Sequence, residues 1–281
     1  MKSLSFDGIA RLYDETRVAD NTCFNSVLDY IASRFPPGDY PHVFEPGIGT
    51  GRIAIPLAQR GYKVTGVDIA PHMLGALSRR LEELHQPLDI FFEEADTTAL
   101  SYRDGVFDAA IIVHLFYFIP DWKRAVDEIS RVVKPDGPLL LMNTGLGTEV
   151  PLLTKRYKEL CSEKGFETHY IGATSTKYVV DHLAGAGFET ETISGPWQWT
   201  VRQSLDQAMY YFRYRAYSYT TFAPDSVHLS VIERMEADLR EEFGGLQAEV
   251  ETPTEITLTV ARRHSCAAPA QRGRKHERDL G

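Results

Sequence analysis

The feature that most constrains the fold is a regular alternation, between residues 42 and 143, of short apolar runs with amphipathic stretches. Nearly continuous apolar runs are typical of strands that are covered on both faces. The stretches between them carry apolar residues at helical spacing. Strands that alternate with helices indicate a doubly wound α/β fold with a mostly parallel sheet. The expected strands are residues 42–45, 62–68, 89–95, 107–113 and 138–143.

The pattern changes after residue 143. Helices are expected over residues 149–164, 176–186, 203–219 and 224–243, and strands over 188–201 and 249–262. The insertion between these last two strands is too long for a hairpin loop, so it predicts a helical lid over the carboxyl edge of the sheet. A single domain is therefore expected over residues 1–263, followed by a disordered tail over 264–281. Within the domain, the expected parts are N-terminal helices (1–39), a cofactor-binding core (40–145), helices and a strand (146–201), the lid (202–247) and the last strand (248–263).

Composition excludes several classes of protein. The chain has 39 acidic and 30 basic residues, a net charge of −9, and this field disfavours a nucleic acid as partner. No apolar run reaches the ~20 residues of a membrane span, and the first residues lack the apolar part of a secretory signal. A cytoplasmic protein with no membrane partner is expected. The three cysteines, Cys23, Cys161 and Cys266, lie far apart, which predicts reduced thiols and no metal site.

The first expected strand ends in a glycine-rich loop, residues 47–51, that leads into a helix. Glycines let the backbone approach a ligand closely, and the helix presents free N–H groups. A dinucleotide fingerprint needs its third glycine at position 52, where Arg52 stands. Glu45, at the end of the strand, would repel a pyrophosphate but suits an ammonium or a sulfonium group. A nicotinamide-dependent reductase is therefore disfavoured.

Further polar side chains follow the next two strands. Asp68 ends the second strand, where an acid can accept hydrogen bonds from a ribose diol. Asp96 and Thr97 follow the third strand and can hydrogen-bond an amine and ring nitrogens of a base. Met73, one helical turn past Asp68, can provide an apolar shelf for a purine. Because the carboxyl ends of parallel strands meet at one edge, a nucleoside site is expected there.

Taken in chain order, these pieces resemble the class I S-adenosylmethionine-dependent methyltransferases of the small-molecule branch. The resemblance covers roughly residues 6–263, and it is carried by residues 44–51, 66–68, 94–96, 107–108 and 131–137. One departure is the turn at 134–137, where the family commonly has two glycines. The resemblance implies a Rossmann-like, seven-stranded sheet with an antiparallel last strand, and S-adenosyl-L-methionine as cofactor.

The resemblance also implies roles for individual residues. Glu45, Gly47 and Gly49 would hold the methionine moiety, Asp68 the ribose, and Asp96 with Thr97 the adenine. The full set of expected cofactor-binding residues is Glu45, Gly47, Gly49, Asp68, Ile69, Met73, Asp96, Thr97 and His114.

Methyl transfer by in-line displacement disperses positive charge, so it requires neither an oxyanion hole nor a metal. A base is needed only if the acceptor must lose a proton. His114 ends the fourth strand and is the leading candidate to orient or deprotonate the acceptor, although a lone histidine is more often structural. Tyr117 is a weaker candidate, as is Tyr13, which resembles a family position that closes over the cofactor.

The expected acceptor-binding residues are Trp197, Trp199, Tyr214 and Arg213, in and before the aromatic segment 210–219. Most aromatic residues there would pack the lid, but some would line a pocket for a flat or apolar molecule. The sequence thus predicts a methyltransferase that acts on an O or N atom of a small, aromatic or hydrophobic molecule. Two alternatives stay open: an RNA or protein methyltransferase, and a non-catalytic S-adenosylmethionine-binding protein.

Overall fold

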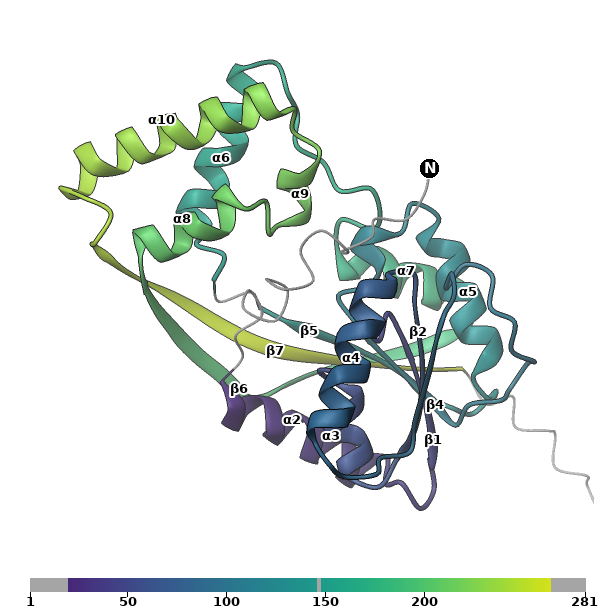
Figure 1. Ribbon diagram of the computed structural model, residues 1–281. Helices are drawn as coiled ribbons and strands as arrows, with labels where there is room; N and C mark the ends of the chain where they lie inside the picture. Colours follow the sequence, from purple (N-terminus) through teal and green to yellow (C-terminus); the bar gives the residue numbers. More distant parts are fainter. Residues whose placement is uncertain (1–19, 146–147, 264–281) are drawn as a thin grey trace, which may run out of the picture.

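The computed structural model describes residues 20–145 and 148–263, so the expectations on Tyr13, Cys266 and the tail lie outside the described residues. One sheet of seven strands runs through the molecule in the order β3-β2-β1-β4-β5-β7-β6 (Figure 1). β1 to β5 are parallel, and β7 is antiparallel to both β5 and β6. The expected fold class is confirmed. The strands are β1 (His42–Pro46), β2 (Lys63–Asp68), β3 (Ile90–Glu94), β4 (Ala109–Val113), β5 (Leu139–Thr144), β6 (Phe188–Ser204) and β7 (Glu249–Arg263).

Helices cover both faces of the sheet because alternate residues of each strand point to opposite sides. Val43 of β1 packs with α2, α3 and α4 on one face, and the next residue, Phe44, packs with α5 and α7 on the other. The helices are α2 (Asn21–Arg34), α3 (Ala54–Gln59), α4 (Pro71–Glu83), α5 (Trp122–Val132), α6 (Pro151–Glu163), α7 (Thr176–Gly185), α8 (Leu205–Arg213), α9 (Ser218–Thr221) and α10 (Asp225–Phe243), with a 3₁₀ turn, η2 (Phe116–Phe118).

The direction in which strands are added to the sheet reverses at β1, which lies between β2 and β4. A crevice opens at such a switch point, at the carboxyl ends of the strands. The glycine loop that follows β1 lies at this point, and Gly47, Gly49 and Gly51 all have positive φ angles. Other residues rarely adopt this conformation, so the loop depends on its glycines.

Gly66 in β2 packs against Ile48 of the same loop. A Cβ atom at this position would lie 2.6 Å from Cβ of Ile48, closer than real Cβ contacts come. We expect Gly66→Ala to lower the free energy of unfolding by about 2–3 kcal/mol, as overpacking of a buried site does. Urea unfolding measures this. Gly185→Ala is the matched control, since a Cβ there meets nothing within 4 Å; an equal loss in both variants would contradict the packing argument.

The lid helices α8, α9 and α10 pack with α6 in a separate hydrophobic cluster, beyond one end of the paired strands β6 and β7 (Figure 1). The prediction of one helix over 203–219 is wrong, because α8 ends at Arg213 and α9 begins at Ser218. Arg215 has a φ of 52°, and its guanidinium donates to the carbonyl oxygens of Thr220 (2.8 Å) and Ala223 (2.7 Å). These bonds stabilise a turn where the sequence pattern suggested a continuous helix.

None of the helices in the described part of the chain combines the length and the apolar character needed to cross a bilayer.

Candidate functional site

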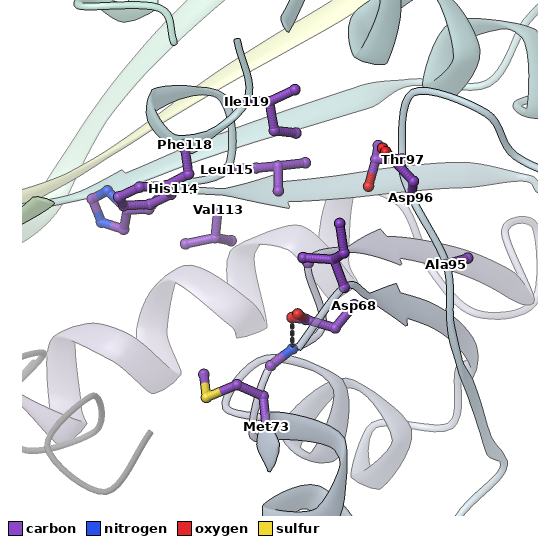
Figure 2. Close-up of a pocket in the computed structure, with 13 residues that line it drawn as sticks. Asp68, Met73, Ala95, Asp96, Thr97, Val113, His114, Leu115, Phe118 and Ile119 are labelled. Atoms are coloured by element: carbon purple, nitrogen blue, oxygen red, sulfur yellow. Dashed lines mark hydrogen bonds between the residues drawn. The ribbon is translucent and has the colours of Figure 1, made fainter. Parts of the chain in front are cut away.

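A cavity of about 620 Å³ opens at the crevice beside β1 (Figure 2). Its lining comes from the loops that follow β1 to β4 and from η2, and it includes every expected cofactor-binding residue except Glu45. The residues that line it are Gly47, Gly49, Asp68, Ile69, Met73, Ala95, Asp96, Thr97, Val113, His114, Leu115, Phe118 and Ile119. Side chains that are far apart in the sequence thus face one space.

Asp68 connects two parts of this cavity. Its Oδ2 accepts the N–H of Gly49 (2.9 Å; Figure 2). Its Oδ1 accepts the N–H of Ala70 (2.9 Å), just before α4. These two bonds fix the carboxylate at the end of β2 and hold the glycine loop against it. A carboxylate fixed in this way is pre-organised to accept hydrogen bonds from a ligand.

Bulky side chains surround the glycine loop closely. A Cβ atom at Gly47 would lie 2.8 Å from Cδ1 of Leu115, and one at Gly49 would lie 3.3 Å from Cε of Met73. A Cβ atom would therefore displace the ends of these side chains, and the positive φ angles of both positions also favour glycine. On the opposite side of the cavity, Asp96 is exposed and accepts from the N–H and hydroxyl of Thr98, whereas Thr97 is buried.

Glu45 does not line the cavity. It is 3% exposed, two residues before Gly47, and its Oε2 has no hydrogen-bond partner among the described residues. Burial raises the pKa of the Glu45 carboxyl well above its usual value, and the positive charge of Arg52 opposes this rise. An unpartnered buried oxygen is unfavourable for the fold alone, so a ligand with a positive charge would relieve it.

His114 directly follows β4 and has a φ of 51°, a left-handed conformation that is uncommon for a residue other than glycine. The backbone N–H of Thr144 donates to its Nε2 (3.2 Å), and the Thr144 hydroxyl lies 2.7 Å from the same atom. Nε2 is engaged, which favours an orienting role over proton abstraction by that atom.

A second cavity of about 810 Å³ adjoins the first, and His114 and Phe118 line both. It lies between the carboxyl ends of β4 and β5 and the lid segment 216–219. The residues that line it are His114, Tyr117, Phe118, Thr144, Glu149, Tyr170, Thr174, Ala216, Tyr217, Ser218 and Tyr219. Of the candidates for catalysis, His114 and Tyr117 therefore face this space.

The four expected acceptor-binding residues line neither of these two cavities. Trp197 is 2% exposed and packs edge-to-face on Tyr30 of α2, and Trp199 packs beside the same core cluster. Arg213 forms ion pairs with Asp206 and Glu236 within the lid. Tyr214 is 56% exposed, directly after α8.

Sequence reasoning missed Glu149 and Tyr170 in the second cavity. Glu149 lies in the segment between β5 and α6, past the carboxyl end of β5, so an argument from that edge of the sheet could have found it. No sequence signal marks Tyr170, which a loop brings into place through hydrogen bonds from the N–H groups of Gly172 and Ala173 to η2. Within residues 20–145 and 148–263, no three histidine, cysteine or acidic side chains are grouped to hold a metal ion.

Comparison with known proteins agrees with this geometry. A family model described as a methyltransferase domain matches residues 44–141. The demethylmenaquinone methyltransferase of Thermus thermophilus is 39% identical over 102 residues, which cover 36% of this chain and 46% of that protein. The ubiquinone biosynthesis O-methyltransferase of Xanthomonas axonopodis is 25% identical over 195 residues, 66% of this chain and 80% of that protein.

Among solved structures, the YcgJ protein of Bacillus subtilis has the same fold. It superposes with a TM-score of 0.58 at 16% identity, over 85% of this chain and 99% of its own. At this identity the likeness shows the fold alone.

Residues 44–141 carry the methyltransferase domain of the class I S-adenosylmethionine-dependent methyltransferase family. S-adenosylmethionine is the methyl donor of this family, and the first cavity fits it, because a fixed strand-end carboxylate and a glycine backbone line it. The unpartnered buried acid, Glu45, lies outside the lining, two residues before Gly47. The chain spans about half the length of the Thermus relative, so the match by itself does not transfer that protein's activity.

Proposed function

We propose that this protein transfers a methyl group from S-adenosylmethionine to an O or N atom of a small molecule. The observation that carries the proposal is the pair of adjoining cavities that share His114 and Phe118. One has the side chains of a nucleoside site, and the other has room for a small acceptor beneath the lid. The names of the two curated relatives, both methyltransferases, support the same reaction.

When bound, S-adenosylmethionine supplies a methyl group on a positively charged sulfur, and its transfer leaves a neutral thioether. The residues of this chain then have mainly a positioning task. Asp68 would accept hydrogen bonds from the ribose, the backbone of Gly47 and Gly49 would hold the methionine portion, and Met73 would contact the adenosyl group. His114 and Tyr117 orient the acceptor, and the lid segment 216–219 excludes water from the second cavity.

The two alternatives make different predictions in one experiment. The purified chain is incubated with S-adenosylmethionine labelled in its methyl group and with separated fractions of metabolites, RNA and protein. Label is expected in a low-molecular-weight product, and its formation should require intact Asp68. Label in RNA or protein would favour the macromolecular alternative. Tight cofactor binding with no transfer to any fraction would identify a non-catalytic binding protein.

A further inference from the structure

The lining of the second cavity is rich in tyrosine and contains one carboxylate. Four tyrosines face it: Tyr117, Tyr170, Tyr217 and Tyr219. Among the described residues that line it, Glu149 is the acidic one, and no lysine or arginine is present. The lining thus combines aromatic rings with a single carboxylate.

The tyrosine rings form one continuous cluster. The ring centroids of Tyr117 and Tyr170 are 6.1 Å apart, those of Tyr170 and Tyr219 are 6.0 Å apart, and Tyr217 stacks on Tyr219 at 5.8 Å. Aromatic ring faces attract cations. Tyr217 and Tyr219 are buried and stack on each other, so the half-buried rings of Tyr117 and Tyr170 provide most of the accessible aromatic surface. Burial raises the pKa of Tyr170 to about 12, so its hydroxyl carries no charge at neutral pH.

The cluster already holds one cation of the chain itself. Nζ of Lys158 lies 4.8 Å from the ring centroid of Tyr219 and 5.7 Å from that of Tyr170, outside the lining of the cavity. These rings are therefore placed for cation–π contact. The ammonium of Lys158 also repels any second cation nearby, so a further favourable charge is needed for one to bind.

Glu149 provides that charge. It is half-buried, two residues before the start of α6, and its Oε1 accepts the hydroxyl of Thr154 (3.1 Å) in the first turn of that helix. The N-terminal end of a helix favours a negative charge, so the carboxylate is held in place there. A carboxylate or phosphate on an acceptor would meet both this charge and the negative ring faces.

We propose that the acceptor is a small amine whose ammonium group binds between Glu149 and the tyrosine cluster, and that the methyl group goes to a different O or N atom of this molecule, one that has a lone pair. The proposal rests on the proposed function and narrows its acceptor class. It concerns recognition, so it can be measured with molecules that are not methylated.

Three probe molecules of similar size but different charge test whether the charge of the ligand determines its affinity for the second cavity. They are choline, its neutral carbon analogue 3,3-dimethyl-1-butanol, and the anion 3,3-dimethylbutanoate. Each is titrated calorimetrically into the wild-type chain saturated with S-adenosylhomocysteine. We expect choline to bind at least tenfold more tightly than the alcohol, and the butanoate to bind most weakly. Equal affinity for choline and the alcohol, or tighter binding of the butanoate, would overturn the proposal.

Two substitutions should shift the affinity for choline in opposite directions. Glu149→Gln is expected to weaken it about tenfold and to leave the affinity for the alcohol unchanged, whereas Lys158→Met should strengthen it severalfold. Glu163→Gln, at the exposed far end of α6, is the control and should change neither. If Glu149→Gln weakened both probes equally, the carboxylate would have a structural role and the proposal would fail.

The saturation step separates this proposal from the function on which it rests. If S-adenosylhomocysteine binds and the probes show no preference for the cation, the amine proposal fails alone. If S-adenosylhomocysteine does not bind, the proposed function fails and the acceptor class fails with it.

Discussion

Replacing Asp68 with alanine is expected to weaken S-adenosylhomocysteine binding by about 100-fold or more, a loss near 2.7 kcal/mol. The substitution removes the acceptor for the ribose hydroxyls, and hydrogen bonds to a charged group contribute about 1.5–3 kcal/mol each. It also releases the N–H groups of Gly49 and Ala70, which the carboxylate holds in place. Isothermal titration calorimetry measures the affinity directly.

Two control variants test this reasoning. Asp89→Asn removes an exposed acid just before β3, at the opposite edge of the sheet, and should leave the affinity unchanged. Asp68→Asn keeps the shape but not the charge and should fall between wild type and alanine. An affinity of Asp68→Ala within threefold of wild type would show that this carboxylate does not bind the cofactor.

Replacing Glu45 with glutamine is expected to have two opposite effects. The variant should be more stable than wild type at neutral pH by about 1–3 kcal/mol, because it removes an ionisable group that burial disfavours as an anion. It should also bind S-adenosylhomocysteine at least tenfold more weakly, because the charge that attracts the ligand's ammonium is lost. Residues that bind a ligand often lower the free energy of unfolding in this way.

The pH dependence of stability distinguishes wild type from this variant. Burial raises the pKa of Glu45, so the folded chain holds this proton more tightly than the unfolded chain does. The resulting stability is fully present below the ordinary glutamate pKa and is lost as pH rises through the folded value. Urea unfolding at several pH values should show this loss in wild type and less of it in Glu45→Gln. Parallel curves would contradict the assignment of a raised pKa.

The first cavity, beside β1, could be predicted from the sequence because its lining follows from the order of the strands along the chain. Parallel strands must end at a common edge, so Asp68, Asp96 and His114, each placed at or just past a strand end, had to approach one another. The glycine spacing separated this site from a dinucleotide site without any tertiary information. Glu45 is the exception, since the sequence could not show that its side chain is buried rather than exposed to the cavity.

The second cavity could not be predicted from the sequence, because its lining is brought together by tertiary contacts. Trp197 and Trp199 lie on β6, and which face of the sheet they reach depends on a register irregularity between Ser194 and Gln198. The break in the lid helix at Arg215 depends on bonds to carbonyl groups farther along the chain. Aromatic composition indicated a pocket, but only packing selected which rings line it.

The most direct measurement of the central claim is a pair of calorimetric titrations of the wild-type chain, one with S-adenosylhomocysteine and one with NADH. We expect S-adenosylhomocysteine to bind at one site per chain, with NADH giving no measurable heat of binding. Binding of NADH, with no binding of S-adenosylhomocysteine, would contradict the account, because the cavity beside β1 would then be a dinucleotide site.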